Sequence, residues 1–208
     1  MKKLIMPVIG LAAALTQTVG AAVVADFFVR PEADALLPFT DRDKRLDMLG
    51  YFKADGAESR VAPDGAPASF LSITSLTDSA MTVSTRGVTV DIAMFVPAPA
   101  DTLIVVSTNL QIGGQTDSSV EYFDSSLQPK GRVDQPAYTE WIVPSMRPKA
   151  TLRVAESVPY VPAKAILDPA TCNVTFVNTA VTDFAEPKDI FRPSISYRYI
   201  KDSFKEVK

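Results

Sequence analysis

The sequence has no histidine and only one cysteine, Cys172. Without histidine the chain lacks the commonest general base and transition-metal ligand, and Ser-His-Asp and Cys-His catalysis are excluded. A single cysteine cannot form an internal disulfide, and a small buried apolar role is expected for it. Nucleophile-elbow, phosphate-loop and Cys-x-x-Cys motifs are also missing. We therefore predict no catalytic residues, no metal and no cofactor, and a carboxylate-dependent enzyme is the catalytic class left open.

The chain also lacks an apolar run long enough to span a bilayer comfortably, which takes about 20 residues. The run at 4–15 is shorter, follows Lys2 and Lys3, and precedes the small residues of 19–22. This pattern predicts a signal peptide over residues 1–22, cleaved after Ala21 or Ala22, rather than a retained membrane anchor. We expect an exported protein of the periplasm or cell surface, with no transmembrane segment after cleavage.

Basic runs are absent as well. Loss of Lys2 and Lys3 with the signal peptide changes the formal net charge from −3 to −5. Because binding to phosphates needs clustered lysine and arginine, nucleic acid is not expected as a partner. The remaining residues, 23–208, fit one domain that can bury about 70% of its unfolded surface.

Short strands dominate the pattern of this domain. In the clearest, 88–96, alternate residues are apolar and share one face because successive side chains point to opposite sides. We predict an α+β fold: an antiparallel β-sheet meander of about seven to nine strands, with an N-terminal amphipathic helix packed on one face. The expected strands are 69–74, 80–85, 88–96, 102–108, 119–124, 151–156, 172–178 and 194–200. Residues 24–28 are a first strand or a packed segment, 31–37 a short helix, 135–149 an irregular loop, and 159–169 a connector or edge segment.

The helix is predicted over 40–54, with Thr40 as its cap. Leu46, Leu49 and Phe52 recur every three residues and are expected to lie on the sheet. Arg45 lies on the same side one turn before Leu49. It must reach the rim or find a partner, since an unpaired buried charge is very costly.

Two groups of residues are candidates for a site. Trp141, Tyr122, Tyr197 and Tyr199 could form an aromatic binding surface for a sugar or peptide, although core and cross-strand packing explains them at least as well. Asp41, Asp43 and Asp47 could build a calcium site or an acid pair, and helix capping with solvated surface is the favoured alternative.

Several short motifs resemble a family of uncharacterised exported proteins, a domain of unknown function, from anaerobic Gram-negative gut and oral bacteria. They are Leu37-Pro38-Phe39-Thr40, the run at 45–52, the run at 120–127, and 195–199 with Phe204 close behind. The family often has tryptophan where Tyr199 stands. The resemblance implies a shared fold and an envelope address but no activity. Because Arg45 and Asp47 lie in the matched motif, we expect them to tie the helix to the sheet or loops.

The favoured hypothesis is a non-enzymatic binding or interaction module of the envelope, with a protein, peptide or glycan as partner. The alternatives are a structural subunit of an envelope assembly and a carboxylate-dependent, glycan-active enzyme. An exposed apolar patch or an unpaired sheet edge would favour the structural subunit.

Overall fold

The computed structural model describes residues 23–37, 40–55, 59–61, 71–85, 87–98, 101–144, 160–180 and 191–207. The predicted signal peptide, the predicted strand at 151–156 and the predicted loop at 182–190 lie outside these residues. The helical elements are α1 (Val24–Phe28), the 3-10 helix η1 (Pro31–Ala35), α2 (Arg42–Asp55) and α3 (Tyr138–Trp141). The strands are β1 (Ser59–Val61), β2 (Leu71–Leu76), β3 (Ala80–Thr85), β4 (Val88–Ala98), β5 (Asp101–Ile112), β6 (Gln115–Asp124), β7 (Pro129–Val133), β8 (Ala163–Asp168), β9 (Asn173–Asn178), β10 (Ser194–Ile200) and β11 (Ser203–Glu206).

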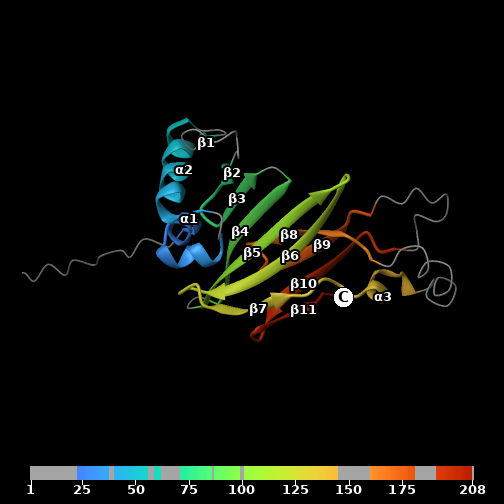
Figure 1. Cartoon of the computed structure of the whole chain (residues 1–208). Coiled ribbons are helices and arrows are strands. Elements are labelled where there is room, and N and C mark those ends of the chain that lie inside the picture. Colours follow the sequence, from blue (N-terminus) through green and yellow to red (C-terminus); the bar gives the residue numbers. More distant parts are fainter. Residues whose placement is uncertain are drawn as a thin grey trace, which may run out of the picture.

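The strands form two antiparallel sheets (Figure 1). The larger sheet has seven strands in chain order, β1 to β7, and the smaller has four in the order β11-β10-β9-β8. The predicted α+β mix and the antiparallel meander are confirmed, but the prediction of a single sheet is wrong. Within each sheet every strand pairs with its neighbours in the chain. Local pattern predicts most of the strands but misses β1, β7 and β11, and the division into two sheets depends on contacts between distant segments.

Among the described strands, β5 and β6 pair over the longest unbroken register. These strands have 12 and 10 residues and pair in register from Leu103↔Asp124 to Ile112↔Gln115. The turn consists of Gly113 and Gly114, both with positive φ, as a two-residue hairpin turn of the primed type requires. The predicted strand 102–108 ends four residues too early, because β5 continues to Ile112.

One hydrophobic cluster, here called the helix-side cluster, joins α1, η1 and α2 to one face of the larger sheet. The helical elements contribute buried residues such as Phe28, Leu37 and Met48. The sheet contributes alternate residues of five strands: Ile73, Met81, Val83, Val90, Ile92, Ile104, Val106 and Phe123.

A second cluster, the inter-sheet cluster, lies between the two sheets. Its members from the larger sheet are Ala93, Phe95, Leu103, Val105, Val120, Tyr122 and Val133. The smaller sheet contributes Ala163, Ala165, Val174, Phe176, Ile195 and Tyr199, and Trp141, Val161 and Cys172 complete the cluster. The continuous apolar run of β5 is thus buried on both faces, as its composition predicts.

Helix α2 begins at Arg42, later than predicted, and it buries a different face from the predicted one. Asp41, not Thr40, caps it: the Asp41 carboxylate accepts the Lys44 N–H at 2.8 Å. Leu46 is 40% exposed, whereas Arg45 has no exposed surface. The buried stripe therefore includes Arg45, Met48 and Leu49, at the i, i+3 and i+4 spacing of one helix face.

The structure also decides between the alternatives that the sequence left open for two other segments. Residues 24–28 form α1 rather than a first strand. The predicted edge segment within 159–169 is β8, an edge strand of the smaller sheet. The strand predicted at 194–200 is β10, and it is followed by the unpredicted β11, which Lys201 and Asp202 connect through a turn with positive φ. Cys172 lies just before β9, not in it, and is buried in the inter-sheet cluster.

Candidate functional site

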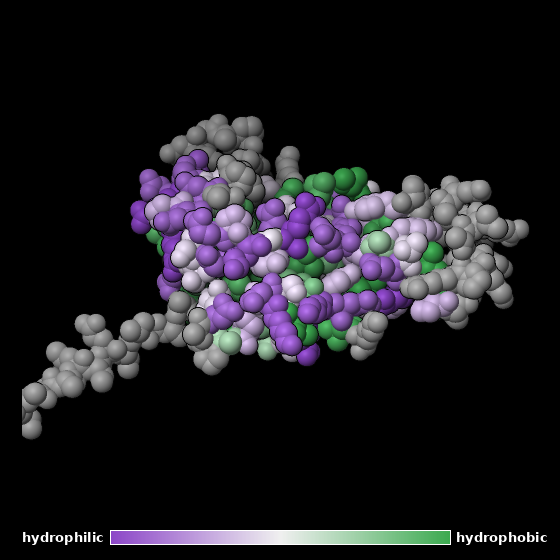
Figure 2. All heavy atoms as spheres, turned by 90° about the horizontal axis from the view of Figure 1, so that it is seen from below, coloured by the Kyte–Doolittle hydropathy of each residue, from purple (hydrophilic) through white to green (hydrophobic). Residues whose placement is uncertain are grey.

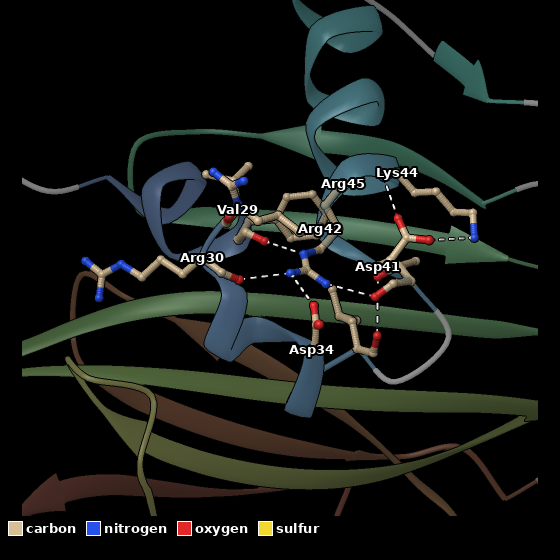
Figure 3. Close-up of polar contacts among 10 residues, drawn as sticks. Val29, Arg30, Asp34, Asp41, Arg42, Lys44 and Arg45 are labelled. Atoms are coloured by element: carbon tan, nitrogen blue, oxygen red, sulfur yellow. Dashed lines mark hydrogen bonds and ion pairs between the residues drawn. The ribbon is translucent and has the colours of Figure 1, made fainter.

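The most connected side chain among the described residues is that of Arg45 (Figure 3). Its guanidinium donates to three backbone carbonyls: Nε to Phe28 O at 2.7 Å, Nη1 to Thr40 O at 2.8 Å, and Nη2 to Arg30 O at 2.9 Å. Nη2 also lies 2.6 Å from a carboxylate oxygen of Asp34. One side chain of α2 thus holds the connection between α1 and η1 and the residue Thr40 that precedes α2.

The carbonyls explain why an arginine can be buried here. Among the described residues, the carbonyl oxygens of Phe28 and Thr40 receive no backbone hydrogen bond, whereas Arg30 O also accepts the Ala33 N–H at 3.1 Å. The planar guanidinium offers five N–H donors in a fixed arrangement, so it can meet several of these oxygens together. The Asp34 side chain is 61% exposed, which lets the carboxylate balance the buried charge while remaining hydrated.

Neighbouring side chains extend this network to the surface. Arg42 Nε donates to Val29 O at 3.0 Å, and Arg30 Nη1 donates to Ser125 O at 2.6 Å in the β6–β7 turn. Lys44 Nζ lies 2.8 Å from the Asp41 carboxylate, and the hydrogen bonds from the Lys44 side chain and backbone lower the pKa of Asp41. These contacts attach the N-terminal segment to α2 and to the larger sheet.

The remaining acids of α2 do not join Asp41. Asp43 and Asp47 are exposed, and no hydrogen bond or ion pair of the described residues involves either carboxylate. Arg45 and Asp47, grouped by the sequence as one tie between helix and fold, therefore lie differently: Arg45 points into the network and Asp47 toward solvent. Within the described ranges no group of three or more acidic or cysteine side chains is arranged to hold a metal ion.

The predicted aromatic residues lie mostly in the interior. Trp141, Tyr122 and Tyr199 are 1%, 8% and 7% exposed and belong to the inter-sheet cluster; Tyr197 is half-buried against it. The rings of Tyr122 and Tyr199 meet edge-to-face at 5.9 Å, and Phe204 of β11 packs on both at 5.2 and 5.3 Å. The geometry is that of core packing between sheets.

A glycine on β7 leaves room for the Tyr122 ring. Gly131 pairs with Tyr122 across β6 and β7, and a Cβ at Gly131 would lie 2.8 Å from the Tyr122 hydroxyl oxygen. Tyr197 stacks edge-to-face on Phe176 at 6.0 Å, and burial, together with the nearby carboxylates of Glu140 and Glu206, raises the pKa of Tyr197 to about 12. The Tyr197 phenol is therefore neutral at physiological pH and acts as a packing group. The Tyr122 ring fits closely against Gly131, which has no side chain to displace it.

A polar network between the sheets is a feature that the sequence reading missed. Asn109 Oδ1 accepts from the hydroxyls of Ser107 at 3.0 Å and Ser118 at 2.5 Å, and its amide donates to Asp91 at 2.8 Å. The Ser118 hydroxyl in turn accepts the backbone N–H of Ala165 on β8 at 2.8 Å. The network joins the edge of the smaller sheet to the larger one. Its signal in the sequence is the replacement of apolar residues by small polar ones at alternate positions of β5 and β6.

A second polar group lies beside it at the surface. The Tyr160 hydroxyl contacts the Asp117 carboxylate and lies 3.2 Å from Gln135 Oε1, while Gln135 Nε2 donates to Asp117 at 2.6 Å. Burial and the hydrogen bond to Asp117 raise the pKa of Tyr160 to about 12. This group ties the segment before β8 to the start of β6, and nothing in it presents a free nucleophile or base.

Helix α3 carries two buried polar atoms, Tyr138 Oη and Trp141 Nε1, that have no hydrogen-bond partner among the described residues. Its backbone is nevertheless anchored, because Arg192 N donates to Trp141 O at 2.7 Å and Ile142 forms a bridge with Phe191.

Cys172 is also enclosed: burial raises the pKa of its thiol, which disfavours the reactive thiolate.

Large apolar side chains are exposed at a few places. Those of the β5–β6 hairpin are Leu110, 43% exposed, and Ile112, 64% exposed. Figure 2 shows hydrophilic side chains gathered over the end of the molecule that carries the helices, and hydrophobic ones in separate patches toward the middle. None of the described helices is long and apolar enough to cross a membrane.

The comparisons with known proteins bear on the fold alone. No protein-family model matches the chain, and the search of curated proteins gave no match. Among solved structures the chain is similar to a domain of an uncharacterized protein from Porphyromonas gingivalis W83, with a TM-score of 0.64, 15% sequence identity, and coverage of 87% of this chain and 95% of that chain. At this identity the likeness shows a shared fold. That the neighbour is an uncharacterised protein of an oral anaerobe agrees weakly with the resemblance drawn from the motifs.

Proposed function

We propose that the protein is an exported, non-enzymatic interaction module of the bacterial envelope that binds a partner protein through the end of the β5–β6 hairpin. The observation that carries this proposal is the exposure of Leu110 and Ile112 on that hairpin. The export part rests on the signal-peptide pattern of residues 1–22 and on the motif resemblance.

The hairpin end is well built for contact. Leu110 and Ile112 are two residues apart in one strand, so their side chains lie on the same face. The pairing of β4 with β5 ends at Val88↔Leu110, and the hairpin continues beyond it to Gly113. In this proposal α2 is the amphipathic helix that packs on one face of the larger sheet and leaves the hairpin end free. Neighbouring exposed apolar side chains on a rigid element favour a binding surface.

In this proposal the aromatic residues have a structural role and do not contact the partner. Trp141, Tyr122 and Tyr199 pack between the sheets and stabilise the scaffold, and the partner contacts the hairpin. This division matches the usual arrangement in which a rigid core positions a binding surface at the end of a longer element.

The structural-subunit alternative rests on another observation, the four edge strands β1, β7, β8 and β11 of the described sheets. Three of these edges carry residues that hinder edge-to-edge pairing: Pro129 and Lys130 on β7, Lys164 on β8 and Lys205 on β11. The Ala165 N–H of β8 is in addition occupied by Ser118. These features favour binding through the hairpin over assembly through sheet edges.

The test is a pull-down from envelope extracts with residues 23–208, followed by mass spectrometry and by photo-crosslinking from position 112. A bound protein should crosslink at position 112, and Ile112→Glu should lower its recovery about tenfold or more, as expected for an interface hot spot. Ile166→Glu is the matched control, because Ile166 is an isoleucine of β8 that is 49% exposed.

Equal loss of the partner with both variants, or crosslinks from position 166 instead, would contradict binding at the hairpin. Recovery of the same chain as the main partner, insensitive to Ile112→Glu, would favour the structural subunit. Release of glycan fragments from the extract by the wild-type protein would favour the carboxylate-dependent enzyme.

A further inference from the structure

Among the residues that the structure describes, Val23 is the first one with a contact. Its backbone nitrogen lies 3.2 Å from the Asp26 carboxylate, and the next nitrogen, of Val24, donates to Asp78 O at 2.8 Å in the β2–β3 turn. Val24 has no exposed surface and Ala25 is 8% exposed. Every residue from Val24 to Phe28 is therefore needed by the helix-side cluster or by the cap of α1, and a shorter chain would lose part of the core.

The sequence before Val23 offers two cleavage points. A cut after Ala22 places the small residues Gly20 and Ala22 three residues and one residue before the scissile bond. A cut after Ala21 places the larger Val19 at the outer position. Because signal peptidases select small residues at both positions, the cut after Ala22 fits better.

From these two observations we propose that processing creates Val23 as the first residue and that its new α-ammonium group forms an ion pair with Asp26. The inference rests on the export part of the proposed function. The step is hydrolysis of the Ala22–Val23 peptide bond by a signal peptidase: one water is consumed, Ala22 leaves with a carboxylate, and Val23 keeps its nitrogen as an ammonium group.

The electrostatics explain why Asp26 stands at this place. A positive charge at the beginning of a helix is unfavourable, because the helix dipole is positive there. The Asp26 carboxylate is exposed, is engaged in no ion pair among the described residues, and already accepts the Val23 N–H. Cleavage would convert this hydrogen bond into a charge-assisted one without any movement of the backbone.

The experiment uses the full chain, residues 1–208, expressed in a Gram-negative host and recovered from the envelope fraction. Intact mass and N-terminal sequencing should show a chain that starts at Val23. Reductive methylation of the α-amino group at neutral pH should then be about threefold slower in the wild type than in Asp26→Asn, since an ion pair that raises the α-amino pKa by about half a unit lowers the reactive fraction by that factor. Glu32→Gln, an exposed acid of η1, is the matched control and should methylate at the wild-type rate.

The outcomes separate this inference from export itself. An uncleaved chain that stays in the cytoplasm would overturn the export proposal. An exported chain that begins at Ala22 or within α1 would overturn the inference while export stands. A Val23 start with equal methylation rates in wild type and Asp26→Asn would overturn the ion pair. If Asp26→Asn does not fold, wild-type protein unfolded in urea supplies the reference rate, and an equal rate in the folded protein is again contradictory.

Discussion

The two faces of the seven-stranded sheet are closed by different means. On the helix side, irregular segments pack on the sheet, and the buried guanidinium of Arg45 satisfies three of their carbonyl oxygens. On the other side, a second sheet packs on the first through aromatic rings, and its polar contacts are short hydroxyl and amide bonds around Asn109.

The difference follows from where each layer finds its backbone hydrogen bonds. Strands satisfy one another through the ladder, so the inter-sheet layer needs side chains mainly to fill space and fix register. A short helix, a 3-10 helix and the turns between them leave carbonyl groups unpaired, so the helix-side layer needs a multivalent donor. On the helix side, one arginine supplies backbone hydrogen bonds of the kind that the ladders supply within each sheet.

The largest expected effect sharpens this contrast at Arg45. Arg45→Met should destabilise the protein by about 4 kcal/mol, because it leaves the buried carbonyls of Phe28 and Thr40 without a donor. Arg45→Lys should recover only part of the loss, since an ammonium group cannot span three oxygens in the way that a guanidinium does. Urea unfolding of purified 23–208 measures both.

Arg42→Met is the matched control: Arg42 is exposed and makes one hydrogen bond, to Val29 O. Its loss should change the free energy of unfolding by less than about 1 kcal/mol. Similar values for the Arg45 and Arg42 variants would mean that the carbonyls of residues 28–40 find other donors, and the contrast between the two faces would fail.

On the inter-sheet side, the largest loss of stability should come from removing an aromatic ring. Phe204→Ala should cost about 2 to 3 kcal/mol, below the value for a fully buried phenylalanine, because Phe204 is only half-buried but contacts Tyr122 and Tyr199. Thermal unfolding is the measurement. Lys205→Ala, the exposed neighbour on β11, should leave the midpoint almost unchanged. A Phe204 variant as stable as the Lys205 variant would show that β11 contributes nothing to this layer.

The polar network between the sheets should give a smaller effect. Asn109→Ala removes the acceptor for Ser107 and Ser118 and the donor to Asp91, and should cost about 2 kcal/mol. Thr108→Ala changes the adjacent, exposed residue on the opposite face and should cost less than about 0.5 kcal/mol. Chemical denaturation of the two variants side by side decides this, and equal values would mean that the network is energetically neutral.

The smallest effect concerns the pH dependence of the α2 cap. The pKa of Asp41 is lowered in the folded protein, so its stabilising contribution is complete above the unfolded value of 3.8 and is lost as the pH falls through the folded value. Asp41→Asn keeps an acceptor oxygen for Lys44 N–H but no charge. Its melting temperature should therefore lie below that of the wild type near neutral pH, and the gap should narrow below pH 3.8. A difference in melting temperature that is the same at both ends of the pH range would show that the Asp41 charge does not stabilise α2. An equal pH-dependent difference for Asp43→Asn would show the same.

The sequence alone determined the local elements of the chain. Alternation in β3, β4 and β10, the glycine pair between β5 and β6, and Pro31 at the start of η1 each fix a conformation over a few residues. Because successive strands pair through short turns, the order of the meander followed from the same information. The sequence also shows that Arg45 must reach the rim or find a partner, since a charge on the apolar side of a helix has to be compensated, but it does not decide between the two.

Only the tertiary structure decided how these elements stack. The alternating pattern of β4 is compatible with one covered face or two, and nothing local assigns the strands after Pro162 to a separate sheet. The same long-range packing decided between a binding surface and core packing for Trp141, Tyr122 and Tyr199, which lie in the interior, and it left Leu46 exposed and Arg45 buried. An aromatic ring or a helix face has the same sequence whether it is covered or not, and what covers it comes from residues far away in the chain, which local pattern does not encode.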